Sequence, residues 1–157
     1  MSYPVRAAII ETYRDWLEGI SVADGYHTNV RKVIATLTPT DNITEHGAIQ
    51  LIDRGDVPRR SVQLVSENRL RLEAWLYGEE GDESEKIGAG HKMLADFEKR
   101  TMEEPTIFDL AIRTEIFEAE VDTNALGGAR ITARRFVEIA YRTERNDPSA
   151  LGDVGWF

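Results

Sequence analysis

The chain has 157 residues, 30% of which are charged, and its formal net charge is −9 at pH 7. A chain of this length fits one globular domain, which buries roughly 70% of the surface that its unfolded form exposes. Because cysteine is absent, disulfides, thiolate nucleophiles and cysteine-based zinc sites are excluded. The acidic balance argues against broad, non-specific binding to nucleic-acid phosphates, which requires a basic surface.

Membrane association is not expected. No apolar stretch of the sequence approaches the roughly 20 residues that a helix needs to cross a bilayer. The first residues enter an amphipathic pattern that contains Arg6 and Asp15, which differs from the apolar centre of a secretory signal. We therefore expect a protein that is not exported through a signal peptide.

Residues 5–20 form the first predicted element, a helix. Pro4 suits a helix start, and Gly19 suits its end. Mostly apolar side chains recur at spacings of three and four, which predicts one buried stripe made of Val5, Ala8, Ile9, Thr12, Tyr13, Trp16, Leu17 and Ile20. Residues 28–37 also fit helical spacing, but their β-branched content favours a strand.

Two more strands are expected over residues 48–54 and 67–77. The first of these is predicted to end at Gly55, Asp56 and Pro58, which are turn-forming residues. In the second, apolar residues alternate with charged or aromatic ones, which predicts a strand with one buried face formed by Leu70, Leu72, Ala74 and Leu76.

A second helix follows the acidic segment 78–85, and Pro105 marks its end. Its predicted stripe consists of Ile87, His91, Leu94, Phe97 and Thr101. Residues 113–123 and 130–143 are the last two expected strands. Few of these connections suit parallel crossovers, so we predict an α+β fold with a mostly antiparallel sheet of about five strands and both helices on one face. Residues 1–150 form one domain, and 151–157 form a C-terminal tail.

The residue pattern predicts no enzymatic site and no cofactor. The three histidines, His27, His46 and His91, lack the spacing of metal ligands. The serines show no nucleophile motif, and the acidic run near residue 80 is typical of a solvated turn. A small hydrolase that uses carboxylates stays open as an alternative, because one sequence cannot show which side chains converge.

Three groups of residues are candidates for subunit or partner contacts. Arg54, Arg59 and Arg60 surround the loop that is predicted after the second strand, and an acidic group consists of Glu79, Glu80, Asp82 and Glu83. Opposite charges of this kind can orient a heterologous contact between subunits, although ordinary solvated surface is the alternative reading. The terminal aromatic pair, Trp156 and Phe157, would dock either on the chain's own core or on a neighbour.

Three segments carry a resemblance to a known family. They are the alternating strand 69–75 (RLRLEAW), the helical segment 92–98 (KMLADFE) and the closing segment 136–148 (FVEIAYRTERNDP), where a hydrophobic strand ends before Asp-Pro. In these short motifs, spread over most of the chain, the sequence resembles tail terminator and minor tail proteins of long-tailed bacteriophages or prophages.

The resemblance implies a structural protein of the virion tail, assembled in the host cytoplasm. It implies a homo-oligomeric ring, with six subunits, that binds the last ring of tail-tube protein and stops its polymerisation. The ring would also contact head-completion or connector proteins, and DNA would pass through it without specific binding. No catalytic, cofactor or metal residues follow from the family. A head–tail connector and a cellular α+β binding module are the alternative readings.

Overall fold

A computed structural model of the protein describes residues 4–36, 47–62, 65–78, 83–121, 131–144 and 147–151. In these ranges the chain forms two α-helices, one short 3-10 helix and six strands. Their bounds are α1 Val5–Leu17, η1 Val22–Asp24, β1 Lys32–Thr36, β2 Ala48–Val62, β3 Val65–Tyr77, α2 Glu83–Glu103, β4 Arg113–Val121, β5 Ile131–Glu144 and β6 Asp147–Leu151.

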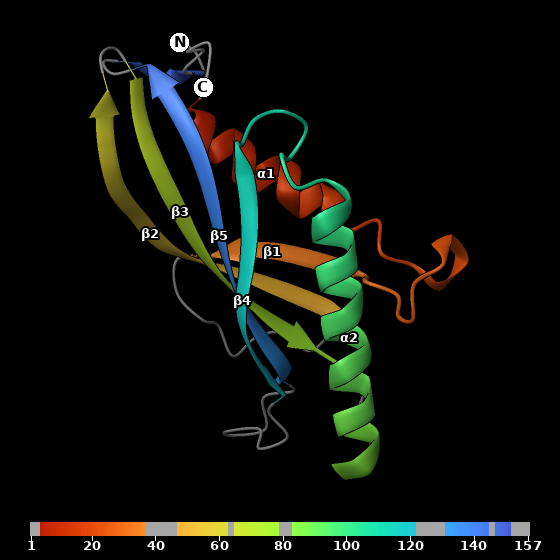
Figure 1. The fold of residues 1–157 in the computed structure, drawn as a ribbon. Coiled ribbons are helices and arrows are strands. Elements are labelled where there is room, and N and C mark those ends of the chain that lie inside the picture. The colour runs from red at the N-terminus through yellow and green to blue at the C-terminus, as the bar shows by residue number, and fades with distance from the viewer. Residues whose placement is uncertain are drawn as a thin grey trace.

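The strands form one mixed sheet in the order β1-β2-β3-β5-β4, with β6 paired to β5. All neighbouring strands are antiparallel except β1 and β2, which are parallel. Figure 1 shows both helices on the same side of the curved sheet. The predicted α+β class and the mostly antiparallel sheet are confirmed, whereas β6 and the parallel pair were not predicted.

Helix α1 begins where the sequence indicates. Pro4 precedes the first turn, and its carbonyl accepts the first helical hydrogen bond from Ala8 at 3.0 Å. The buried residues of α1 follow a four-residue spacing and are Val5, Ile9, Tyr13 and Leu17. This spacing places them along one stripe, which faces the sheet and α2.

Helix α2 completes the core. Phe97 is fully buried and meets the ring of Tyr13 edge to face, with ring centroids 6.3 Å apart. The Tyr13 hydroxyl also lies 2.7 Å from the hydroxyl of Thr101. Helix α2 packs on β5 and β4, while α1 contacts β1 and β6. No helix in the described part of the chain is both long and apolar enough to span a bilayer.

Strand β2 is longer than predicted. The prediction ended it at Gly55, Asp56 and Pro58, but the pairing with β3 continues to Val62. The register shifts between Asp53 and Asp56, and Gly55 adopts a left-handed φ of 91° there. The turn-forming residues therefore build a β-bulge inside a long strand instead of a loop.

The two faces of the sheet differ sharply. On the face that the helices cover, called the helix face below, Leu70, Leu72, Ala74 and Leu76 of β3 are all buried. The alternating residues of β3 point to the opposite side, called the outer face below. This confirms the alternation that the sequence shows.

Candidate functional site

Charged residues from four strands converge on the outer face. Six arginines and five glutamates with described side chains occupy outward register positions between β2 and β4: Arg54, Glu67, Arg69, Arg71, Glu73, Arg113, Glu115, Arg134, Glu138, Arg142 and Glu144. The chain as a whole has a formal net charge of −9. Positive and negative charges nearly balance among these residues, so the acidic surplus of the chain lies elsewhere.

Glutamates bind the strands of the outer face together. The buried carboxylate of Glu73 accepts hydrogen bonds from Arg54 Nε at 2.8 Å and from Trp75 Nε1 at 2.8 Å. Glu138 of β5 accepts one from Arg69 Nη1 of β3 at 2.7 Å. Charged donors of this kind make short, oriented bonds. The outer face is consequently an ordered surface rather than a set of independent solvated side chains.

An aromatic pair lies within this charged surface. Phe117 of β4 and Phe136 of β5 are direct register partners, and their rings stack with centroids 6.3 Å apart and an interplanar angle of 16°. Phe117 is 38% exposed. The helices of the described ranges cover the other face of these strands, and an exposed aromatic group ringed by charge is typical of a contact surface.

The outer face changes character toward β1. There Gln50, Ile52 and Tyr77 are buried, and the Tyr77 hydroxyl donates to Gln50 Oε1 at 2.9 Å. Gln50 Nε2 in turn donates to Thr36 Oγ1 at 2.9 Å. The accessible part of the outer face therefore extends from β3 to β4.

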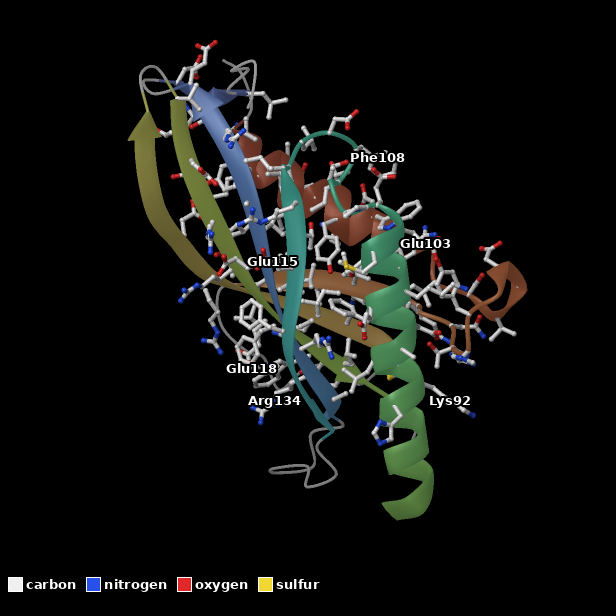
Figure 2. All side chains as sticks on the ribbon, in the orientation of Figure 1. Lys92, Glu103, Phe108, Glu115, Glu118 and Arg134 are labelled. Carbon is white, nitrogen blue, oxygen red and sulfur yellow. The ribbon has the colours of Figure 1, made fainter. Side chains whose placement is uncertain are left out.

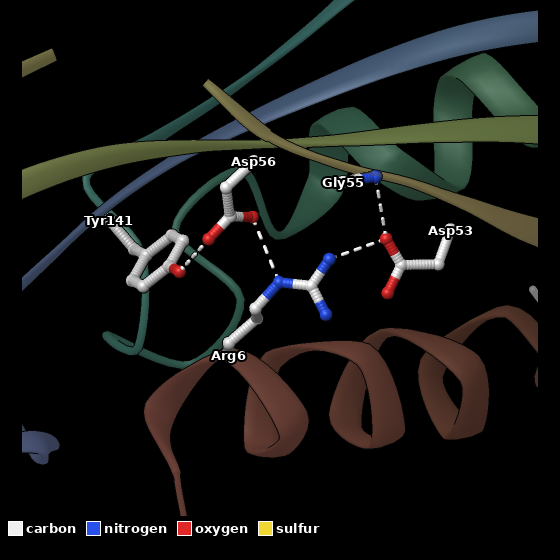
Figure 3. Close-up of polar contacts among 5 residues, drawn as sticks. All are labelled: Arg6, Asp53, Gly55, Asp56 and Tyr141. Carbon is white, nitrogen blue, oxygen red and sulfur yellow. Dashed lines mark hydrogen bonds and ion pairs between the residues drawn. The ribbon is translucent and has the colours of Figure 1, made fainter. Parts of the chain in front are cut away.

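A second polar cluster lies on the helix face, where α1 meets β2 and β5 (Figure 3). Arg6 of α1 donates from Nε to Asp56 Oδ1 at 2.9 Å and also forms an ion pair with Asp53. The Tyr141 hydroxyl of β5 donates to the other oxygen of Asp56. Because Asp53 and Asp56 are three residues apart, a regular strand would turn them to opposite faces; the bulge at Gly55 brings both to Arg6.

The protonation states in this cluster of Arg6, Asp53, Asp56 and Tyr141, called the clamp below, fit a structural role. Burial acts to raise the pKa of Asp53, but the Arg6 hydrogen bond, the Gly55 N–H and the Arg6 charge outweigh it, so the pKa is lowered. Burial, and then the bond to Asp56, raise the pKa of the Tyr141 hydroxyl. A carboxylate that stays ionised and a phenol that stays neutral are poor proton-transfer groups near neutral pH. The cluster therefore anchors α1 to the sheet.

The basic residues that the sequence singles out do not surround a loop. Arg54 lies on β2 beside the bulge, and its guanidinium pairs with Glu73 of the same chain. Arg59 and Arg60 also belong to β2, and Arg60 pairs in register with Glu67 of β3. The side chains of Arg59 and Arg60 are not described, so their predicted role in contacts stays a prediction.

The acidic group and the aromatic tail lie mostly beyond the described ranges. The residues outside these ranges are Glu79, Glu80, Asp82, Trp156 and Phe157. Glu83 is the first residue of α2, and its side chain is not described. The acidic segment follows the end of β3 at Tyr77, which pairs with Ala48. Arg60 pairs with Glu67 near the other end of the hairpin of β2 and β3. At about 3.4 Å per residue, this pair lies roughly 35 Å from Tyr77. The end of β3 that leads into the acidic segment therefore lies far from Arg60.

Metal ligands do not converge in the described ranges, where no group of three or more histidine, aspartate or glutamate side chains could hold an ion. His91 is exposed on α2, so it does not pack with the stripe on which it was predicted. The backbone N–H of His27 donates to Asp96 at 2.9 Å. His46 lies outside those ranges.

Sequence comparison gives no relative that would fix a function. The chain matches no protein-family model and no curated protein. The aromatic pair of Phe117 and Phe136 and the clamp of Arg6 were both missed from the sequence. The pair could have been found only from the register of β4 on β5, and the clamp only from the bulge in β2.

Proposed function

We propose that the protein is a ring-forming structural protein that caps a phage tail tube, stops its polymerisation and provides the interface for head–tail joining. The resemblance of segments 69–75, 92–98 and 136–148 to tail terminators suggests this role. The structural observation that supports it is the outer face, where ordered arginine–glutamate pairs surround the stacked Phe117 and Phe136.

A subunit of a closed ring needs two different surfaces that complement each other. The outer face supplies one candidate surface, where arginine–glutamate pairs surround the stacked phenylalanines. Opposite charges orient such contacts and speed their formation.

The experiment combines light scattering and electron microscopy of the purified protein, first alone and then with the tail-tube protein encoded nearest to its gene. We expect a particle of one defined mass, about six times that of the chain, and tubes that stop growing when it is added. The Phe117→Asp variant should fold normally but neither form the particle nor cap tubes. A strictly monomeric protein that never caps tubes would contradict the proposal, and a ring that leaves tube length unchanged would favour a head–tail connector.

A further inference from the structure

The connection between α2 and β4 contains a strained turn. Three consecutive residues, Ile107, Phe108 and Asp109, have positive φ angles of 47°, 53° and 65°. Residues other than glycine seldom adopt this conformation, and they do so singly rather than in runs. Such strain persists only where surrounding contacts impose it, and it concentrates at functional positions. The contacts of these three residues, called the 107–109 turn below, therefore show how firmly the strain is held.

The first residue of the turn is fixed by the core. The Ile107 side chain is buried, and its N–H donates to the Glu104 carbonyl at 3.0 Å. The Ile107 carbonyl accepts a hydrogen bond from the Leu110 N–H at 3.2 Å, and the Ala111 N–H donates to the Thr106 carbonyl at 2.9 Å. The position of Ile107 is therefore set from both sides.

The other two residues are held at the surface. Phe108 is 52% exposed, and its ring meets Trp16 of α1 edge to face with centroids 5.4 Å apart. Its N–H donates to the Glu104 side chain at 3.2 Å, and the exposed Asp109 carboxylate accepts a long hydrogen bond from the Thr106 hydroxyl at 3.5 Å. Contacts of this kind contribute about as much free energy as one or two left-handed residues cost. The strained conformation of Phe108 and Asp109 is therefore held by a narrow margin.

Trp16, which Phe108 contacts, has a fixed position of its own. Its Nε1 donates to the Arg100 carbonyl at 2.7 Å, and Arg100 Nε donates to the Trp16 carbonyl at 2.7 Å. The guanidinium lies 3.3 Å from the centre of the indole ring. Gly19 leaves space for it, since a Cβ there would collide with the guanidinium. These contacts join the C-terminal ends of α1 and α2, so Phe108 can move against a rigid base.

We propose that the 107–109 turn is a conformational switch with two positions. In the closed position, which the structure shows, Phe108 and Asp109 are left-handed and the Phe108 ring contacts Trp16. In the open position both residues return to ordinary backbone angles and the ring leaves Trp16, while Ile107 stays in the core. Opening relieves strain, and closing restores the ring contact, so the two positions are close in free energy.

The switch controls whether the rings of Phe108 and Trp16 contact each other or are available to another molecule. It concerns a single chain and does not depend on the proposed ring-forming function. The turn can therefore be tested on the protein alone, whatever its state of assembly.

Substitutions of Asp109 test the switch, because this side chain is exposed and can be changed without disturbing the core. Asp109→Gly favours the closed position, since glycine adopts a positive φ without strain. Asp109→Val opposes it, since a β-branched residue with a positive φ is a strong outlier. We expect valine to raise the ratio of open to closed chains about five- to thirty-fold, and glycine to lower it about five-fold. Asp109→Asn is the matched control, because asparagine tolerates this conformation as aspartate does.

Trp16 reports the position of the Phe108 ring. Fluorine NMR of protein that contains 5-fluorotryptophan observes the three tryptophans, and Trp16→Phe identifies the signal of Trp16. Phe108→Ala removes the ring and defines the signal of the open position. The Trp16 signal of Asp109→Val should move toward that reference value, and the signal of Asp109→Gly should move away from it. Asp109→Asn should stay at the value of the parent protein.

Glu118 separates the switch from a general effect of backbone strain. It also has a positive φ, of 48°, and Figure 2 shows it on β4, well away from Phe108. Glu118→Gly and Glu118→Val should therefore change the stability of the protein and leave the Trp16 signal unmoved. The switch would be overturned if the Asp109 variants left the Trp16 signal in place, or if glycine and valine moved it in the same direction. Asp109→Ala, a milder change in the direction of valine, replaces Asp109→Val if that variant does not fold.

Discussion

The helix face and the outer face belong to the same strands, yet different interactions hold them. The helix face is closed by apolar side chains of the helices and of the strands beneath them, among them the fully buried Phe97 of α2 and Leu70 and Leu72 of β3. The outer face is held by arginine–glutamate pairs such as Arg69 with Glu138, and by one stacked pair of phenylalanines.

The two faces differ in how much they stabilise the fold. Burial of a large apolar side chain contributes roughly 1.5–3 kcal/mol, whereas an exposed ion pair such as Arg113 with Glu115 contributes about 0–1 kcal/mol. The helix face therefore supplies most of the free energy of folding. The exposed residues of the outer face contribute little to folding, so they can serve contacts with another molecule.

The largest expected effect compares one phenylalanine from each face. Phe97→Ala should lower the free energy of unfolding by about 3–5 kcal/mol, because it leaves a cavity in the core. Phe117→Ala should lower it by about 1 kcal/mol, since that ring is partly exposed and loses mainly its stacking on Phe136. Urea denaturation followed by circular dichroism measures both. Similar losses at the two positions would show that the outer face is also part of the core.

The next effect concerns the clamp between α1 and β2. Arg6→Met should destabilise the protein by about 1.5–3 kcal/mol, because Asp53 and Asp56 lose their charged donor in a half-buried place. Arg14→Met is the control on the same helix; its pair with Asp15 is exposed, so a change below about 0.5 kcal/mol is expected. Equal effects of the two substitutions, measured by urea denaturation, would contradict the assignment of Arg6 as an anchor.

The same clamp predicts a dependence on pH. The pKa of Asp53 is lowered in the folded protein, so its contribution to stability is fully present above the ordinary aspartate pKa of about 3.9. That contribution is lost as the pH falls through the lower folded value. The stability gap between the parent and Arg6→Met should therefore narrow as the pH drops below about 4. A gap of constant size in acid-titrated urea denaturation would argue against the clamp.

The smallest expected effect lies at the edge strand β4. Glu118 has a positive φ of 48° at a register shift opposite β5, whereas Glu115 lies within the regular part of the strand. Glu118→Gly should raise the free energy of unfolding by about 0.5–1 kcal/mol, because glycine adopts this conformation without strain. Glu115→Gly should lower it by a similar amount. Thermal denaturation of the pair tests whether the signs are opposite.

Much of the fold could be predicted from local patterns. The four-residue spacing in α1 and the alternation of Leu70, Leu72 and Ala74 on β3 both record which side chains face the core. The buried residues of a helix or strand recur at a fixed spacing, so a single sequence is enough to show which face is buried. The long α2 and the strands β4 and β5 were predicted for the same reason.

The errors fall where residues far apart in the sequence meet. Gly55, Asp56 and Pro58 have the composition of a turn, and only the continued pairing of β2 with β3 makes them a bulge. Strand β6 includes Pro148 and has no alternation; it forms because β5 offers it a partner. Of the predicted contact residues, Arg54 is tied to Glu73 within its own chain, which the sequence could not show.

By itself, the sequence determined the α+β class, the two helices and the buried face of β3, because the period of apolar residues is a local property. The tertiary structure alone decided the register of the strands. That register stacks Phe117 on Phe136, pairs arginines with glutamates on the outer face and turns Asp53 and Asp56 together toward Arg6. Such features depend on contacts between distant segments, whose relative placement arises only when the whole core closes.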